Sequence, residues 1–99
     1  MQPEIWIGTI EISYTEPEKP NSTKRAFSVV TTWASSVEEF RHKCDLMLES
    51  HGWTLLGIEA ANPVPPDAAF GDEMEDMLER TRADEAATIY GTFHTYTLM

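Results

Sequence analysis

Several features are scarce or absent in this chain of 99 residues. Cys44 is its single cysteine, so no intramolecular disulfide can form and a zinc site built from several cysteines is excluded. No apolar run approaches the length of about 18 residues that a membrane-spanning helix needs. The first residues, 1–6, lack the basic stretch that precedes the apolar core of a secretory signal. We therefore expect a soluble, cytoplasmic protein with no membrane contact.

Sequence motifs for catalysis are also lacking. The five glycines stand apart from one another, so no phosphate-binding glycine loop is present. Neither the nucleophile elbow of serine hydrolases nor the paired-histidine helix of zinc proteases occurs. Cys44 has no evident base beside it and is expected to be a small buried side chain. The sequence thus predicts no enzyme activity, no cofactor and no metal site.

Positive charge is the third scarce feature. Seven Lys and Arg residues stand against 17 Asp and Glu residues, which gives a net charge of −10. Nucleic acids and anionic membranes attract clusters of basic residues, so this balance argues against both as partners. Residues 67–99 hold eight acids and two bases, a net charge of −6, and all eight acids fall within 67–85.

Four segments have the composition of β-strands. Residues 4–15 and 24–34 are rich in β-branched and aromatic side chains, and the polar, proline-containing segment 16–22 separates them. They are expected to form a hairpin with a long loop. Residues 53–61 and 88–98 have similar compositions and are predicted to be the third and fourth strands.

The first helix carries the clearest local signals. Ser36 and Glu39 have the spacing of a capping box, in which each side chain accepts a hydrogen bond from the other residue's backbone N–H. Apolar side chains then recur at helical spacing up to Leu48, and Gly52 suits the left-handed residue that ends a helix. The opposite stripe of acids and His42 is expected to be a solvated face rather than a metal site.

A second helix is predicted to begin between Asp67 and Asp72 and to end near Thr81 or Ala83. Carboxylates crowd its first turns, where the helix dipole favours negative charge. These residues are the predicted charged binding surface: Asp72, Glu73, Glu75, Asp76 and Glu79.

The predicted element order is ββαβαβ over a single domain, residues 1–99. This order favours the α+β class and a two-layer α/β sandwich. We expect one mixed four-stranded sheet, with β-α-β crossovers after the second and third strands and both helices on one face.

Such an arrangement leaves one sheet face to explain, because the strands carry apolar side chains on both faces. In the last strand Tyr90, His94 and Tyr96 share the face that also carries Thr92. A contiguous exposed patch of this kind is typical of an interface for a partner or a second copy. The alternative is that partly exposed aromatic residues break the patch up.

The leading functional hypothesis is a small acidic, non-catalytic protein-binding module, an inhibitor or an immunity-type partner of a basic toxin or nuclease. The acidic helix would attract the basic partner, and the aromatic sheet face would supply contact area or self-association. One alternative is a small-ligand protein or minor enzyme with a polar-aromatic pocket of Tyr90, His94 and Tyr96. Another is a structural homodimer whose sheets pack face to face.

Overall fold

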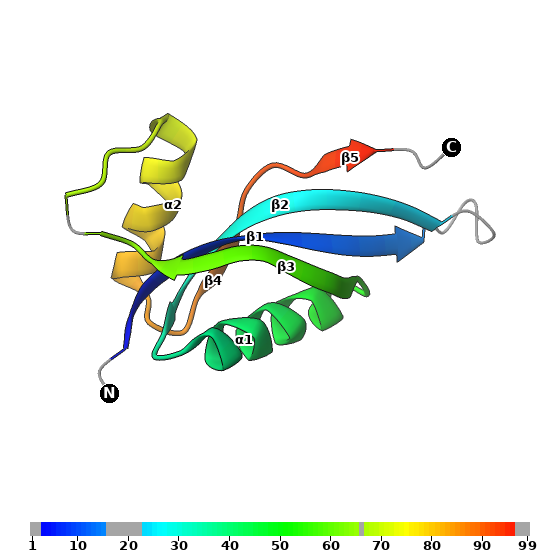
Figure 1. The fold of residues 1–99 in the computed structure, drawn as a ribbon, viewed down its shortest axis with the longest axis horizontal. Helices are drawn as coiled ribbons and strands as arrows, with labels where there is room; N and C mark the ends of the chain where they lie inside the picture. The colour runs from blue at the N-terminus through cyan, green and yellow to red at the C-terminus, as the bar shows by residue number, and fades with distance from the viewer. Residues whose placement is uncertain (1–2, 16–22, 66, 97–99) are drawn as a thin grey trace.

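A long antiparallel hairpin forms the centre of the molecule (Figure 1). The computed structural model describes residues 3–15, 23–65 and 67–96. Strands β1 (Glu4–Thr15) and β2 (Thr23–Ala34) pair along their whole length, which confirms the predicted hairpin. The predicted connecting loop lies outside the described residues.

The remaining strands add to the two edges of this hairpin. Strand β3 (Thr54–Pro63) pairs with β1, and the short strands β4 (Thr88–Tyr90) and β5 (His94–Tyr96) both pair with β2. The order across the sheet is β3-β1-β2-β4, with β5 following β4 along the same edge of β2. The α+β class and the ββαβαβ order are confirmed, the last predicted strand being divided in two.

Every strand pair is antiparallel, which corrects the expected mixed sheet. Strand β3 does run parallel to β2, as a crossover requires, but β1 lies between them and makes both contacts antiparallel. The fourth strand runs antiparallel to the third, so the second expected crossover is wrong. The order of strands in a sheet depends on pairings between distant segments, which the local pattern does not reveal.

One face of the sheet packs on helix α1 (Val37–Ser50). The Ser36 hydroxyl accepts a hydrogen bond from the Glu39 amide at 3.2 Å, while the Glu39 carboxylate accepts from the Ser35 amide at 2.9 Å. The predicted capping box is therefore present with one difference: the Glu39 carboxylate accepts from the amide of Ser35 and not from that of Ser36. Gly52 has φ 75°, as expected beyond a helix end. The core on this side consists of Ile10, Ile12, Ala26, Val30, Ala34, Phe40, Cys44 and Leu48.

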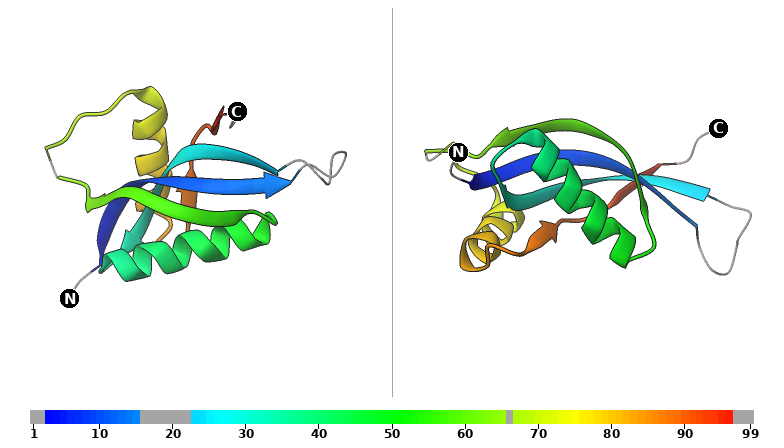
Figure 2. Two further views of the ribbon diagram at one scale, coloured as in Figure 1. Left: turned by 45° about the vertical axis from the view of Figure 1, so that its right-hand side comes forward. Right: turned by 90° about the horizontal axis from the view of Figure 1, so that it is seen from below.

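Helix α2 (Asp72–Ala83) lies on the opposite face, so the placement of both helices on one face is wrong (Figure 2). Neighbouring residues of β2 show the two sides: Val30 belongs to the α1 core, whereas the Thr31 hydroxyl lies 2.7 Å from the Thr81 hydroxyl of α2. The Trp33 indole N–H also donates to the Thr81 carbonyl at 2.6 Å. The surplus of apolar residues is thus largely explained by a helix on each face.

The last strand is interrupted by an irregular segment, residues 91–93. Tyr90 pairs with Val30 and His94 pairs with Phe27, so three residues of this strand stand opposite two of β2. The one extra residue forms a bulge. Each side chain after it points to the sheet face opposite to the one that an uninterrupted strand would give it. None of the described helices is both long and apolar enough to cross a membrane.

Candidate functional site

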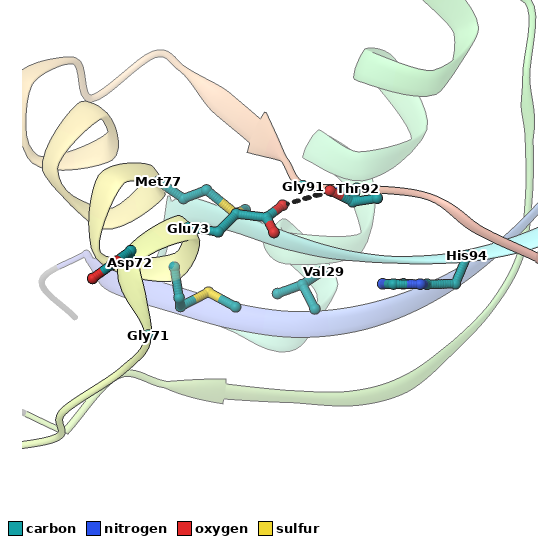
Figure 3. Close-up of a pocket in the computed structure, with 9 residues that line it drawn as sticks. Val29, Gly71, Asp72, Glu73, Met77, Gly91, Thr92 and His94 are labelled. Atoms are coloured by element: carbon teal, nitrogen blue, oxygen red, sulfur yellow. Dashed lines mark hydrogen bonds between the residues drawn. The ribbon is translucent and has the colours of Figure 1, made fainter.

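A hollow of about 390 Å³ lies between the first turns of α2 and the interrupted last strand (Figure 3). Its floor is apolar and consists of Val29 of β2 with Met74 and Met77 of α2. Polar groups surround this floor: Asp72 and Glu73 on the helix side, Thr92 and His94 on the strand side. The side chains of Glu73 and His94 approach the hollow from two different elements.

The Glu73 carboxylate is held by the strand. Its Oε1 atom accepts hydrogen bonds from the backbone N–H and from the hydroxyl of Thr92, each at 2.9 Å. These two bonds stabilise the charged form and hold the pKa of Glu73 below its usual value, with a smaller contribution from the charge of His94. The carboxylate therefore stays ionised at neutral pH and has a defined position.

The bulge in the last strand creates this contact. Gly91 donates its N–H to the Val29 carbonyl at 2.9 Å, and Ser28 donates its hydroxyl to the Gly91 carbonyl at 3.2 Å. A Cβ at Gly91 would lie 3.0 Å from Glu73 Oε1 and 3.1 Å from the Met77 sulfur. Only a glycine lets the helix and the strand approach this closely without displacement of a neighbour.

The structure brings some of the predicted site residues together and separates others. Asp72, Glu73 and His94 line the same hollow. Tyr90 instead points to the α1 side, where its ring centroid lies 5.2 Å from that of Phe93. Tyr96 pairs with Arg25, and its side chain lies outside the described part of the structure.

The expected pocket shared by Tyr90 and His94 is therefore not formed. Alternation along an uninterrupted strand would place residues 90 and 94 on the same face. The bulge between them places their side chains on opposite faces. Tyr90 belongs to an aromatic cluster with Phe93, His51 and Trp53, and the His51 and Trp53 rings are stacked at 4.5 Å.

The outer side of α2 carries the other predicted charged residues. A shallow hollow of about 340 Å³ is lined by Asp72, Glu75, Asp76, Glu79 and Arg82. Asp76 makes an exposed ion pair with Arg80 at 3.4 Å, and the Glu75 carboxylate accepts from the Phe70 amide at 3.2 Å. Four carboxylates stand against the two cations Arg80 and Arg82 on this surface, so its net charge is negative.

No protein-family model, curated protein or solved structure matches this chain. Over residues 3–15, 23–65 and 67–96, no group of three or more His, Cys, Asp and Glu side chains is arranged to hold a metal ion.

Sequence reasoning missed the apolar floor and the strand side of the site: Val29, Met74, Met77, Gly91 and Thr92. One signal was available. An isolated glycine within a run of β-branched and aromatic residues is typical of a bulge or a close backbone approach, and Gly91 provides both. Its partner in that approach, Glu73, is 18 positions earlier in the sequence and could not be identified from the pattern.

Cys44 has the buried position expected for it, with no exposed surface. Burial, with a smaller contribution from the charge of Asp45, raises the pKa of its thiol from 9.0 to about 12. The thiolate is the reactive form, so we expect iodoacetamide at pH 8 to alkylate the folded protein at least about 100-fold more slowly than the urea-unfolded chain. Equal rates measured by mass spectrometry would contradict this.

The same shift predicts a loss of stability in alkali. Above pH 9 the thiol of the unfolded chain loses its proton while the folded thiol keeps it, so unfolding becomes more favourable as the pH rises toward 12. The stabilisation that comes from the buried neutral thiol is complete well below pH 9. The free energy of unfolding falls by about 1.4 kcal/mol between pH 8 and 10. Urea denaturation of the wild type and of Cys44→Ala isolates this effect, since the variant lacks the titrating group.

Proposed function

We propose that this protein is a non-catalytic binding module that docks a basic protein partner on the outer side of α2. The carrying observation is the acidic hollow on that surface, with the exposed carboxylates of Asp72, Glu75, Asp76 and Glu79. An inhibitor or an immunity-type protein for a basic toxin or nuclease is the class that best fits a small acidic domain of this kind. Neutralising a basic surface requires charge complementarity and contact area rather than catalysis.

The attachment of α2 supports this proposal. Met77, Leu78 and Thr81 are buried against the sheet, while the carboxylates of the first turns remain exposed. The charge is consequently displayed on a helix fixed to the body of the protein, which lowers the entropy lost on binding.

The distribution of charge also supports it. Residues 67–99 carry a net charge of −6 out of the total of −10. A surface of one sign attracts an oppositely charged partner and raises the association rate, and salt weakens the effect.

The test reverses charge on α2 and compares it with an equal reversal elsewhere. Asp76→Lys combined with Glu79→Lys changes the net charge by four units, as does Asp45→Lys with Glu49→Lys on α1. In low salt, we expect the immobilised wild-type protein and the α1 variant to retain the same basic protein from a lysate of the cells in which this protein naturally occurs. The α2 variant is expected to lose it.

The retained protein is then purified, and its affinity is measured by calorimetry. We expect the α2 reversal to weaken binding at least about tenfold, and an increase in salt from 50 to 200 mM to weaken it further. Circular dichroism checks that both variants remain folded. Retention of no basic protein, or equal losses in the α1 and α2 variants, would overturn the proposal.

A further inference from the structure

The hollow beside Glu73 differs in chemistry from the outer side of α2. Its floor is apolar, with the buried Met77 and the half-buried Val29 and Met74. One fixed carboxylate, that of Glu73, stands at its edge, and within the described residues only the Oε1 atom of that carboxylate accepts hydrogen bonds. The Oε2 atom is therefore left to receive a donor from a ligand.

An apolar floor beside an ionised carboxylate suits a cation on an aliphatic stem. The stem would lie over Val29 and the methionine side chains, and the charged head would reach Glu73. Guanidinium fits better than ammonium because it is more weakly hydrated, so it loses less on contact with an apolar floor.

The dimensions are consistent with a single side chain. The volume of about 390 Å³ lies at the low end of the range of small-molecule pockets, which is roughly 300–1,000 Å³. Glu73, Thr92 and His94 are exposed, so the hollow opens at the surface and a side chain can enter while its backbone stays outside.

We propose that this hollow is an anchor pocket for an arginine side chain of the protein partner. Glu73 accepts the hydrogen bonds of its guanidinium group, and its aliphatic part packs on Val29, Met74 and Met77. This inference rests on the proposed function, because the arginine belongs to the basic partner. The outer acidic side of α2 attracts that partner, and the pocket gives the complex its position. Central pockets that bury an arginine commonly dominate the energy of an interface.

The experiment uses the full chain labelled with ¹⁵N and the pentapeptide acetyl-Gly-Gly-Arg-Gly-Gly-amide. We expect saturable chemical-shift changes at the amides of Glu73, Gly91 and Thr92. The same peptide with citrulline replaces the guanidinium by a neutral group of nearly the same shape and should give no saturable change. The lysine peptide should bind several-fold more weakly than the arginine peptide.

Two variants and a matched control test the geometry. Glu73→Gln keeps an oxygen for both Thr92 bonds but removes the charge, and should weaken binding at least about tenfold. Gly91→Ala places a methyl group 3.0 Å from Glu73 Oε1, so it should displace this carboxylate slightly and weaken binding by less than Glu73→Gln does. Gly57→Ala adds the same methyl group where no atom lies within 4 Å, and should leave binding unchanged.

Equal binding of the arginine and citrulline peptides, or unchanged binding to Glu73→Gln, would overturn the pocket. Binding of free n-butylguanidinium without binding of the peptide would overturn its role as a protein anchor. If the arginine peptide does not bind but a basic partner is retained through α2, the arginine pocket is overturned and the proposed function is not. Binding of the peptide with no basic partner retained would overturn the proposed function and, with it, the role of the hollow as an anchor for a partner, and would leave only its affinity for an arginine side chain.

Discussion

Replacement of Phe40 by alanine is expected to lower the free energy of unfolding by about 3–5 kcal/mol. Phe40 has no exposed surface and is the largest of the fully buried side chains. It extends from α1 into the core formed with β1 and β2, and its ring centroid lies 6.4 Å from that of Trp6. Alanine would remove the ring and leave a cavity that the flanking strands can close only in part.

A loss of this size is a large fraction of the stability of a domain of about 100 residues, roughly 5–15 kcal/mol. Urea denaturation followed by circular dichroism measures it, and a lower melting temperature should accompany it. Leu46→Ala is the matched control, because Leu46 lies on the same helix but is 54% exposed. It should change stability by less than about 0.5 kcal/mol. Similar effects of the two substitutions would contradict the assignment of Phe40 to the core.

The second large effect is expected from Gly8→Ala, which should destabilise the protein by about 2–3 kcal/mol. A Cβ at this position would lie 2.6 Å from the Phe40 ring and 2.6 Å from the Ala60 carbonyl oxygen. Gly8 pairs with Ala61 in β3, so the added methyl group would be caught between a neighbouring strand and α1. One of the close atoms belongs to the backbone, and it cannot move without disturbing the pairing of β1 with β3.

The sign of this effect distinguishes it from intrinsic propensity. Alanine is ordinarily favoured over glycine within a strand, by roughly 0.5–1 kcal/mol. Gly57→Ala in β3, where the added methyl group meets no atom within 4 Å, should therefore be neutral or slightly stabilising. Chemical denaturation of both variants gives the comparison. A Gly8→Ala variant as stable as Gly57→Ala would show that α1 does not approach β1 this closely.

Local patterns predicted the elements well where their causes are local. Strand β1 has the predicted bounds, and β2 begins one residue earlier than predicted. Helix α1 follows the cap at Ser36 and ends before Gly52, because capping and the left-handed φ act within a few residues. Helix α2 begins at Asp72, the later limit of the predicted range, and its acidic first turn is present.

The candidate site was predicted only in part. The acidic residues of α2 were found because charge is visible in a sequence, and His94 was included because of its place in the last strand. The pairing of His94 with Tyr90 failed because the extra residue between Tyr90 and His94 exchanges the faces of the strand. The Met74 and Met77 floor was missed because the same spacing also describes an ordinary buried helix face.

The sequence by itself determined the types of the elements and their order. It also determined the scarcity of positive charge and the concentration of acidic residues between positions 67 and 85. Only the tertiary structure decided that the helices cover opposite faces, that every strand pair is antiparallel, and that Glu73 meets Thr92 across the bulge. Propensity, capping and charge act over a few neighbouring residues, so they can be read along the chain. Strand order and the register of an interrupted strand depend on contacts between distant segments, and these form only when the whole core packs.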